Sequence, residues 1–381
     1  MRHMIIFLLV SLILCGCASS GPEPEPATMP PATTPATEET TVPTTEPVDP
    51  IYTLLESMTT EEKVGQLFLA RCPDSGAVDD IRTYHLGGYI LFGRDFDGQT
   101  PDSFRLKIET YQIVSPIPML IAVDEEGGTV CRVSRNSAFR GSKFPAPRES
   151  YASGGMEQVL AIETEKAALL HELGINVNMG PVCDITTGSG AFMFARSLGE
   201  DPDVTGRFAS SVIRIYENHR IGSVLKHFPG YGNNSDTHTQ MVRDSRTMEE
   251  LESADLIPFA AGVESGADAI LVSHNIVQAI DDTAPATLSP AVHTYLRHTM
   301  GFEGVIVTDD LIMEAITDAY GPEEAAVLAV LAGNDLLCSS EYTIQYPAVL
   351  DAVQSGRISM EQLNSSILRI LNWKRELGLI F

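Results

Sequence analysis

The chain has 381 residues, of which 44% are hydrophobic and 20% are charged, a composition typical of a globular protein with a substantial core. Its 51 acidic side chains outnumber its 25 basic ones, which gives a formal net charge of -26 at pH 7. Because binding to a phosphate backbone depends on clustered lysines and arginines, this balance argues against a nucleic-acid partner.

The first 17 residues, MRHMIIFLLVSLILCGC, are organised like a secretory signal. Arg2 supplies a positive charge, and the apolar run that follows, from Met4 to Leu14, is too short for a comfortable membrane span. The segment ends in Leu-Cys-Gly-Cys, which resembles the bacterial lipoprotein signal, in which cleavage exposes a cysteine that is then lipid-modified. This resemblance implies a lipid anchor on Cys17 in the bacterial cell membrane, facing outside the cytoplasm. Plain secretion with another cleavage point is the alternative.

Residues 18–50 contain nine prolines, eight threonines and neither lysine nor arginine. A segment of this composition has almost no apolar surface to bury and cannot offset the entropy that ordering would cost. We therefore expect a disordered tether that holds residues 51–381 away from a membrane surface. A glycosylated stalk is the alternative.

Four cysteines lie beyond the signal, with no CxxC pair and no histidine at a spacing that suits zinc. Their apolar neighbours predict buried free thiols. A disulfide outside the cytoplasm is the alternative, and the spacing identifies no pair. The four are Cys72, Cys131, Cys183 and Cys338.

Eight short apolar runs recur from residue 51 onward, rich in Val, Ile and Leu without a clean alternation, as in strands buried on both faces. Helical stretches separate them, among them 157–174 and 203–220, and Thr59-x-x-Glu62 resembles a capping box at the start of the first helix. The runs are QLFLAR (66–71), GGYILF (87–92), PMLIAVD (118–124), GINVNMGPV (174–182), GSVLKHF (222–228), DAILVSH (268–274), GVIVTDD (304–310) and NDLLCSS (334–340).

Eight strand-and-helix units in about 330 residues predict one α/β domain, a single (β/α)8 barrel over residues 51–381. The alternative is an open doubly wound sheet, which usually has fewer strands and a glycine-rich first turn, but the chain contains neither GxGxxG nor a P-loop. The last stretch, 359–377, is an amphipathic helix that we expect to close the barrel. No hydrophobic segment remains for a second domain.

Polar side chains end four of the eight predicted strands. Asp124 ends the third strand, Lys226 and His227 end the fifth, His274 ends the sixth, and the two aspartates of VTDD end the seventh. Because a barrel places its chemistry at the carboxyl ends of its strands, we expect these groups on one rim. A cleft with carboxylates, a lysine and histidines suits a polar, hydroxyl-rich substrate.

Several motifs resemble glycoside hydrolase family 3, and especially its β-N-acetylglucosaminidase branch, over nearly all of the globular part. KHFPG followed by a D-x-H triplet is specific to that branch. The resemblance implies a (β/α)8 barrel, a retaining mechanism with a glycosyl-enzyme intermediate, and no metal or organic cofactor. The motifs are DEEGGTVCRV (124–133), ARSLGEDP (195–202), KHFPGYG (226–232), APATLSP (284–290) and GFEGVIVTDDLIMEAI (301–316).

By this resemblance Asp309 is the nucleophile, His238 is the acid/base and Asp236 orients His238. A strand end exposes the Asp309 carboxylate for attack, whereas Asp310 faces the other way along an extended chain. A histidine beside a carboxylate stays poised near neutral pH, so that it protonates the leaving oxygen and then activates water. The alternatives are a helix N-cap for Asp309 and a solvated polar turn for the D-x-H triplet.

The resemblance also implies which residues hold the sugar through its hydroxyl and acetamido groups. For the arginines among them, pairing with a surface carboxylate is the alternative. His274 has no clear role and fits a core histidine equally well, while Asp184 fits a structural role. The matched positions are Asp124, Arg132, Arg196, Lys226 and His227.

The loop after 226–230 departs from the usual KHFPGHGD and D-S-H sequences of the branch. Tyr231 replaces a histidine, Asn233 replaces an aspartate and Thr237 replaces a serine, and the loop is one residue shorter before Asp236. We expect the dyad to be retained and the path of the loop to differ, which bears on substrate range more than on chemistry.

The sequence therefore predicts a lipid-anchored, monomeric exo-β-N-acetylglucosaminidase that acts on peptidoglycan fragments or chitin-like oligosaccharides. One alternative is a family 3 β-glucosidase or β-xylosidase, although these generally lack the KHFPG and D-x-H loop. Another is a phosphorylase, because a histidine acid/base repels phosphate less than a carboxylate does. The third, a lipoprotein that binds muropeptides without cleaving them, is disfavoured because every expected catalytic residue is present.

Overall fold

Eight parallel strands form the centre of the structure, a computed structural model that describes residues 49–199, 201–236 and 241–381. Neighbouring strands follow one another in chain order, and β1 pairs with β12. Val307 of β11 pairs with Leu336 beside β12, so the sheet closes into a barrel and the doubly wound alternative is excluded. The strands are β1 (Phe68–Arg71), β2 (Gly88–Leu91), β3 (Leu120–Val123), β6 (Val177–Asn178), β7 (Gly222–Phe228), β9 (Ala269–Val272), β11 (Val305–Thr308) and β12 (Leu337–Ser339).

Each barrel strand lies within one of the eight apolar runs found in the sequence. Every residue of β2, β3, β7, β9 and β11 is buried, as expected for strands covered on both faces. The β6 strand is short, but the chain resumes pairing with β7 farther along, between Val182 and Lys226. The prediction of a (β/α)8 barrel is confirmed.

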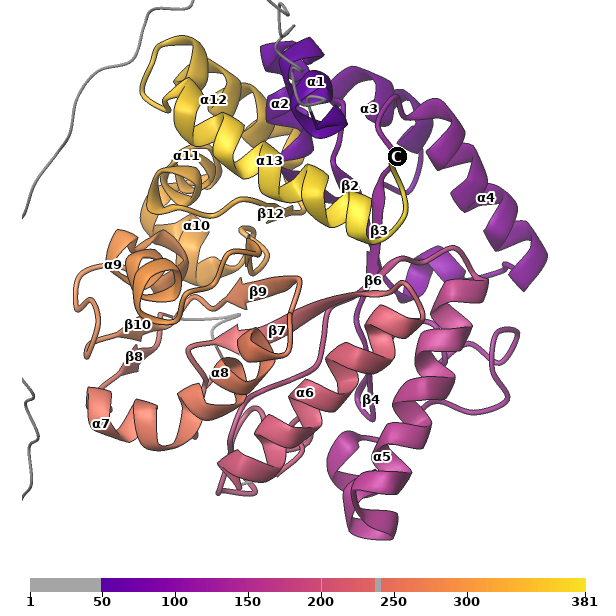
Figure 1. Ribbon diagram of the computed structural model, residues 1–381, viewed down its shortest axis with the longest axis vertical. Helices are drawn as coiled ribbons and strands as arrows, with labels where there is room; N and C mark the ends of the chain where they lie inside the picture. Colours follow the sequence, from indigo (N-terminus) through magenta and orange to yellow (C-terminus); the bar gives the residue numbers. More distant parts are fainter. Residues whose placement is uncertain (1–48, 200, 237–240) are drawn as a thin grey trace, which may run out of the picture. The chain divides into compact units, whose positions relative to one another are not determined.

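Helices surround the strands (Figure 1). Short 3-10 and π-helical turns, η1 (Gly93–Phe96), η2 (Leu251–Asp255), η3 (Ala286–Leu288) and η4 (Tyr295–Thr299), complete several connections. The helices are α1 (Pro50–Ser57), α2 (Thr60–Gln66), α3 (Ala77–Tyr84), α4 (Pro101–Val114), α5 (Pro147–Glu172), α6 (Pro202–Asn218), α7 (Met248–Glu250), α8 (Leu256–Glu264), α9 (Pro290–Thr294), α10 (Glu314–Tyr320), α11 (Pro322–Ala332), α12 (Tyr342–Gln354) and α13 (Met360–Glu376).

The start of α2 is the predicted capping box. The Thr59 hydroxyl accepts the Glu62 backbone N–H at 3.2 Å, and the Glu62 carboxylate accepts the Thr59 backbone N–H at 2.8 Å. The α5 element begins at Pro147, but its backbone is not helical at Gly154 and Gly155, so the helix predicted from residue 157 is the segment that follows this break. Gly155 has a φ of 65°, in the left-handed region that glycine adopts readily, and this glycine pair separates a first helical segment from the predicted one.

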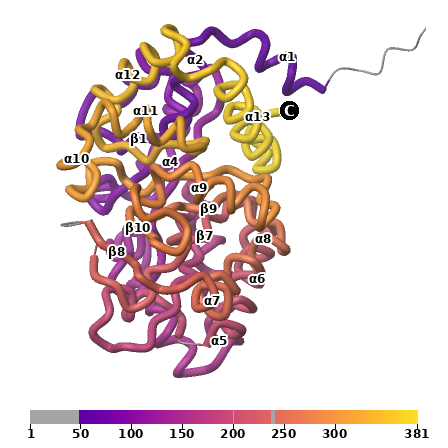
Figure 2. Tube along the Cα trace, turned by 90° about the vertical axis from the view of Figure 1, so that its left-hand side faces the viewer, coloured from indigo at the N-terminus to yellow at the C-terminus, as the bar shows by residue number. Residues whose placement is uncertain are grey.

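The C-terminal helix α13 lies across the amino-terminal end of the barrel, as predicted. Its Trp373 ring packs on Gly222 at the start of β7, where a Cβ atom would lie 2.7 Å from the indole. Asp335, just before β12, accepts a hydrogen bond from Ser366 of the same helix at 2.8 Å. Figure 2 shows α1 and α13 together, and Asp49 pairs with Arg375 at 2.8 Å.

Two short strand pairs lie outside the barrel. The β4 (Glu125–Gly127) and β5 (Val130–Cys131) strands form an antiparallel hairpin directly after β3, and β8 (Arg243–Asp244) pairs with β10 (Ile276–Val277). The four cysteines beyond the signal are buried free thiols, as predicted. Within the described ranges, no helix has the length and apolar character needed to cross a membrane.

Candidate active site

A cavity of about 600 Å³ lies at the carboxyl ends of the barrel strands. Its walls come from the ends of several strands and from the loops that follow β3 and β6. Residues from positions far apart in the sequence therefore meet on one rim, as the strand-end argument predicts. The predicted site residues that line the cavity are Asp124, Arg132, Arg196, Lys226, His227 and Asp309.

Lys226 lies between two carboxylates. Its ammonium is 2.7 Å from Asp124 and 2.6 Å from Glu126, and the lysine side chain is buried. Burial alone would lower the pKa of Lys226, but the two carboxylates outweigh it and raise that pKa above its ordinary value. The lysine is therefore a permanent positive charge in the wall of the cavity.

Glu126 joins Lys226 to Arg196. The Arg196 guanidinium donates two hydrogen bonds to the Glu126 carboxylate, at 2.7 and 2.8 Å, in the bidentate arrangement that fixes both groups. Burial would raise the pKa of Glu126, but Arg196 and Lys226 together hold it well below its ordinary value. Arg196 thus pairs with a buried carboxylate, so the alternative that it pairs with a carboxylate on the protein surface is wrong for this arginine.

His227 is held by Asp184. Nδ1 of His227 is 2.8 Å from Oδ2 of Asp184, and its Nε2 lies 3.2 Å from Arg196. The second Asp184 oxygen accepts the backbone N–H of Tyr231 at 2.7 Å, and Asp184 is fully buried. Asp184 therefore has the structural role suggested by the sequence, since it orients the imidazole at the cavity wall.

Asp309 and Asp310 follow β11 directly and both line the cavity. The Asp310 carboxylate accepts the Ser340 hydroxyl at 2.5 Å and the backbone N–H groups of Ser340 and Ile312. Burial raises the pKa of Asp310 above its ordinary value. Asp309 accepts the backbone N–H of Asp310 at 2.9 Å, which leaves the two neighbouring carboxylates in different surroundings.

His274 does not lie on the cavity rim, so the prediction that it joins the other strand-end groups there was wrong. The strand ends at Val272, and the imidazole two residues later turns into the core, where Nδ1 is 2.8 Å from the Thr287 hydroxyl. Its Nε2 lies 3.1 Å from the carbonyl oxygen of Asp310. The core-histidine interpretation is the one that the structure supports.

Two residues that depart from the usual sequence of the branch, Tyr231 and Asn233, make contacts at the start of the loop after β7. Tyr231 is buried, with its ring edge-on to His227 at 5.3 Å between centroids. Asn233 accepts the backbone N–H groups of Thr187 and Gly188 at 3.1 and 3.2 Å. These contacts attach the loop to the segment that follows β6, although the loop lacks the histidine and the aspartate that are usual at these two positions in the branch.

Arg246 joins the two ends of this loop. It donates to the carbonyl oxygen of Gly230 at 2.7 Å and to Asp255 at 2.6 Å, and it also binds Asp244. Asp236 is a half-buried residue of the described chain, whereas Thr237 and His238 lie outside the described residues, as Cys17 does. The relation of His238 to Asp309 therefore remains a prediction.

The comparisons with known proteins agree with this geometry. Residues 59–373 match the glycosyl hydrolase family 3 N terminal domain. The chain belongs to glycoside hydrolase family 3. As a family 3 member it is similar to beta-hexosaminidase LpqI of Mycobacterium tuberculosis, with 31% identity over 330 residues that cover 83% of each chain.

Two further proteins that this chain resembles are longer than it is. Beta-hexosaminidase A of Pseudoalteromonas piscicida is 31% identical over 332 residues, which are 78% of this chain and 54% of that protein. This chain therefore spans about half the length of that relative. The structure of a glycoside hydrolase family 3 beta-N-acetylglucosaminidase from Paenibacillus sp. str. FPU-7 superposes with a TM-score of 0.79 at 33% identity, over 85% of this chain and 63% of that one.

Two carboxylates of this family 3 site were not identified from the sequence. Glu126 is the centre of the buried charge network, and Glu125 accepts the backbone N–H groups of Arg132 and Val133 at 2.8 and 2.7 Å, which holds the β4–β5 hairpin. The signal was the pair of glutamates directly after a buried strand, in DEEGG. From the sequence alone such a pair is equally consistent with a solvated turn, because the groups that bind the two carboxylates lie elsewhere in the chain.

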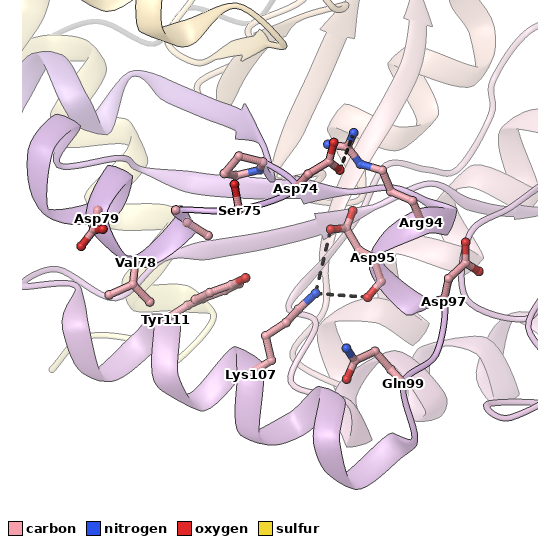
Figure 3. Close-up of a pocket in the computed structure, with 13 residues that line it drawn as sticks. Asp74, Ser75, Val78, Asp79, Arg94, Asp95, Asp97, Gln99, Lys107 and Tyr111 are labelled. Carbon is pink, nitrogen blue, oxygen red and sulfur yellow. Dashed lines mark hydrogen bonds and ion pairs between the residues drawn. The ribbon is translucent and has the colours of Figure 1, made fainter.

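A second cavity, of about 460 Å³, lies beside the rim between the loop after β1 and α4 (Figure 3). Both of its basic side chains have partners within the cavity wall. Arg94 is 2.9 Å from Asp74, and the Lys107 ammonium donates to the carbonyl oxygen of Asp95 at 3.1 Å. These contacts explain the two basic groups of this cavity without a ligand.

Proposed function

We propose that this family 3 member is a retaining exo-β-N-acetylglucosaminidase. The observation that carries the proposal is the cavity in which Asp309 shares one rim with the charged groups of Asp124, Arg196 and Lys226 and with the imidazole of His227. The names of the relatives, beta-hexosaminidase and beta-N-acetylglucosaminidase, support the same activity.

The reaction has two steps. Asp309 attacks the anomeric carbon of the terminal sugar, and the bond from that carbon to the leaving oxygen breaks as His238 gives this oxygen a proton. Neutral His238 then takes a proton from water, whose oxygen bonds to the anomeric carbon while the bond to Asp309 breaks. Asp236 keeps the protonated form of His238 available, and two inversions give net retention.

The charged network holds the sugar against this reaction centre. Asp124 accepts hydrogen bonds from ring hydroxyls, Lys226 donates to the hydroxyl and acetamido groups beside them, and the imidazole of His227 contacts the same groups. Arg132 and Arg196 donate from the same wall. Because Glu126 already fixes Lys226 and Arg196 within 2.6 to 2.8 Å, these donors are oriented before the sugar arrives.

The natural substrates are peptidoglycan fragments or chitin-like oligosaccharides outside the cytoplasm. Residues 1–17 are the lipoprotein signal segment, Cys17 carries the lipid, and residues 18–50 are the tether of the catalytic domain, residues 51–381. Cell fractionation tests this arrangement. The native protein is expected in the membrane fraction and a Cys17→Ala variant outside it, whereas equal distribution removes the anchor.

Hydrolysis of nitrophenyl-GlcNAc by the purified protein, beside nitrophenyl-glucoside and with or without phosphate, tests the activity. We expect turnover of the GlcNAc substrate alone, independent of phosphate. Preference for the glucoside indicates a β-glucosidase, and a requirement for phosphate indicates a phosphorylase. Binding of muropeptides without turnover of either substrate indicates a non-catalytic lipoprotein.

A further inference from the structure

His274 lies in the core, fully buried, but it binds the backbone beside the proposed nucleophile. Its Nε2 is 3.1 Å from the carbonyl oxygen of Asp310. Because a carbonyl oxygen only accepts hydrogen bonds, Nε2 carries a proton and is the donor in this bond. Asp310 directly follows Asp309, so the imidazole acts one residue away from the carboxylate that attacks the sugar.

The imidazole of His274 is itself held by APATLSP, a motif to which the proposed reaction gives no role. The Thr287 hydroxyl of this motif is fully buried and lies 2.8 Å from Nδ1. The backbone N–H of Thr287 donates to the Ser273 carbonyl oxygen at 3.0 Å, and the residue before it donates to the Asn275 carbonyl oxygen at 2.8 Å. The motif therefore bonds the chain on both sides of His274 as well as its ring, which fixes the direction of the imidazole.

Asp310 is also held by residues that do not belong to this motif. The hydroxyl and the backbone N–H of Ser340, directly after β12, donate to its carboxylate at 2.5 and 3.1 Å. The Met313 backbone N–H donates to its carbonyl oxygen at 3.2 Å, beside His274. The backbone N–H of Asp310 then donates to the Asp309 carboxylate at 2.9 Å. The orientation of the nucleophile therefore follows that of Asp310.

The hydrogen bond from His274 lies where the pairing between β11 and β9 ends. The β11 strand ends at Thr308, and the backbone N–H of Asp309 still reaches the Val272 carbonyl oxygen at 3.2 Å. The carbonyl group of Asp310 has left this pairing and is bonded by His274 and Met313 instead. Because a misplacement of about 1 Å in a reacting group costs about 100-fold in rate, a donor at this point has a direct effect on catalysis.

We propose that His274, held by Thr287, is a positioning residue for the reaction. Its hydrogen bond to the Asp310 carbonyl oxygen keeps the Asp309 carboxylate directed at the anomeric carbon. This inference rests on the proposed function, which makes Asp309 the nucleophile, and goes beyond it by giving a role to a core histidine and to the APATLSP motif.

The test compares two variants that differ in one donor. His274→Leu is apolar and removes the N–H group, whereas His274→Gln keeps a side-chain N–H group of similar reach. With nitrophenyl-GlcNAc, we expect His274→Leu to lower kcat by about ten-fold or more and to leave KM within about two-fold of the native value. His274→Gln should recover most of the loss. Calorimetry should show unchanged binding of free N-acetylglucosamine in both variants, because the residues proposed to hold the sugar are intact.

Two further variants separate positioning from stability. His293 of α9 is a second buried histidine, whose Nδ1 lies 2.8 Å from the Ser289 carbonyl oxygen. His293→Gln should lower Tm and leave kcat unchanged. Thr287→Val keeps the shape of the side chain but removes the hydroxyl, and should lower kcat by about three-fold at constant KM. This variant serves if His274→Leu does not fold.

Three results overturn the positioning role. The first is a native kcat in His274→Leu, or in Thr287→Val if the leucine variant does not fold. The second is a loss of N-acetylglucosamine binding in proportion to the loss of kcat, as expected for a general loosening of the site. The third is a His274→Gln variant no more active than His274→Leu. Failure of the proposed function is seen separately, as no turnover of nitrophenyl-GlcNAc by the native protein.

Discussion

Nδ1 of His227 lies 2.8 Å from Oδ2 of Asp184, and the same oxygen accepts the backbone N–H of His227 at 3.1 Å. A carboxylate in this position places a proton on Nδ1, while Nε2, at the cavity wall, lies 3.2 Å from the Arg196 guanidinium. One buried carboxylate therefore sets both the orientation and the tautomer of a residue proposed to hold the sugar.

An Asp184→Asn substitution should lower kcat/KM on nitrophenyl-GlcNAc by about ten-fold or more. The two carboxylate oxygens of Asp184 accept hydrogen bonds from His227 and from the Tyr231 backbone N–H, whereas asparagine has only one accepting oxygen. Its NH2 group would also favour the tautomer of His227 that carries the proton on Nε2. Steady-state kinetics measure the effect, with the exposed Asp351→Asn as the control. Native-like kinetics in Asp184→Asn would show that the tautomer of His227 is not important.

Glu126→Gln should raise KM and lower kcat/KM by about ten-fold or more, because Lys226 and Arg196 lose the charge that orients them. Thermal unfolding measured beside the kinetics distinguishes a loss of orientation of Lys226 and Arg196 from a loss of the folded structure. Glu125→Gln is the matched variant, since Glu125 holds backbone N–H groups of the hairpin. We expect it to lower Tm with a smaller effect on KM. An unchanged KM in Glu126→Gln contradicts the role of the network.

Arg246→Gln should loosen the loop that carries Asp236 and His238, because Arg246 connects Gly230 at its start with Asp244 of β8 at its end. Since His238 is proposed to protonate the leaving oxygen, kcat should fall more for substrates with poor leaving groups than for those with good ones. Arg243→Gln, on the exposed side of β8, is the control. An equal fall for both substrate classes would assign Arg246 to stability alone.

Lys374 makes stability depend on pH. Burial lowers its pKa to about 7, from a value of 10.5 for a free lysine. Between these two values the unfolded chain binds more protons than the folded one, so the free energy of unfolding rises with pH, by up to about 1.4 kcal/mol per pH unit. Denaturant unfolding of the native protein and of Lys374→Met at several pH values between about 7 and about 9 checks this. If the free energy of unfolding changed with pH equally in the two proteins, Lys374 would be excluded as the source of the pH dependence.

The barrel was predictable because strands buried on both faces leave continuous apolar runs, and eight such runs stand out in this chain. The convergence of Asp124, Lys226 and Asp309 followed from the geometry of barrel strand ends. The role of Glu126 was not predictable, because its burial depends on Arg196 and Lys226, which lie 70 or more positions away. Nor was the inward turn of His274, which depends on where its strand ends.

Mass spectrometry of the glycosylated protein tests the assignment of Asp309 as nucleophile most directly. With dinitrophenyl-GlcNAc, whose leaving group needs no proton, His238→Ala should still form the covalent intermediate but lack the base that activates water. We predict the added mass of one N-acetylglucosaminyl group, located on the peptide that contains Asp309 and absent from Asp309→Asn. The same mass on another peptide, or native turnover by Asp309→Asn, would contradict the mechanism.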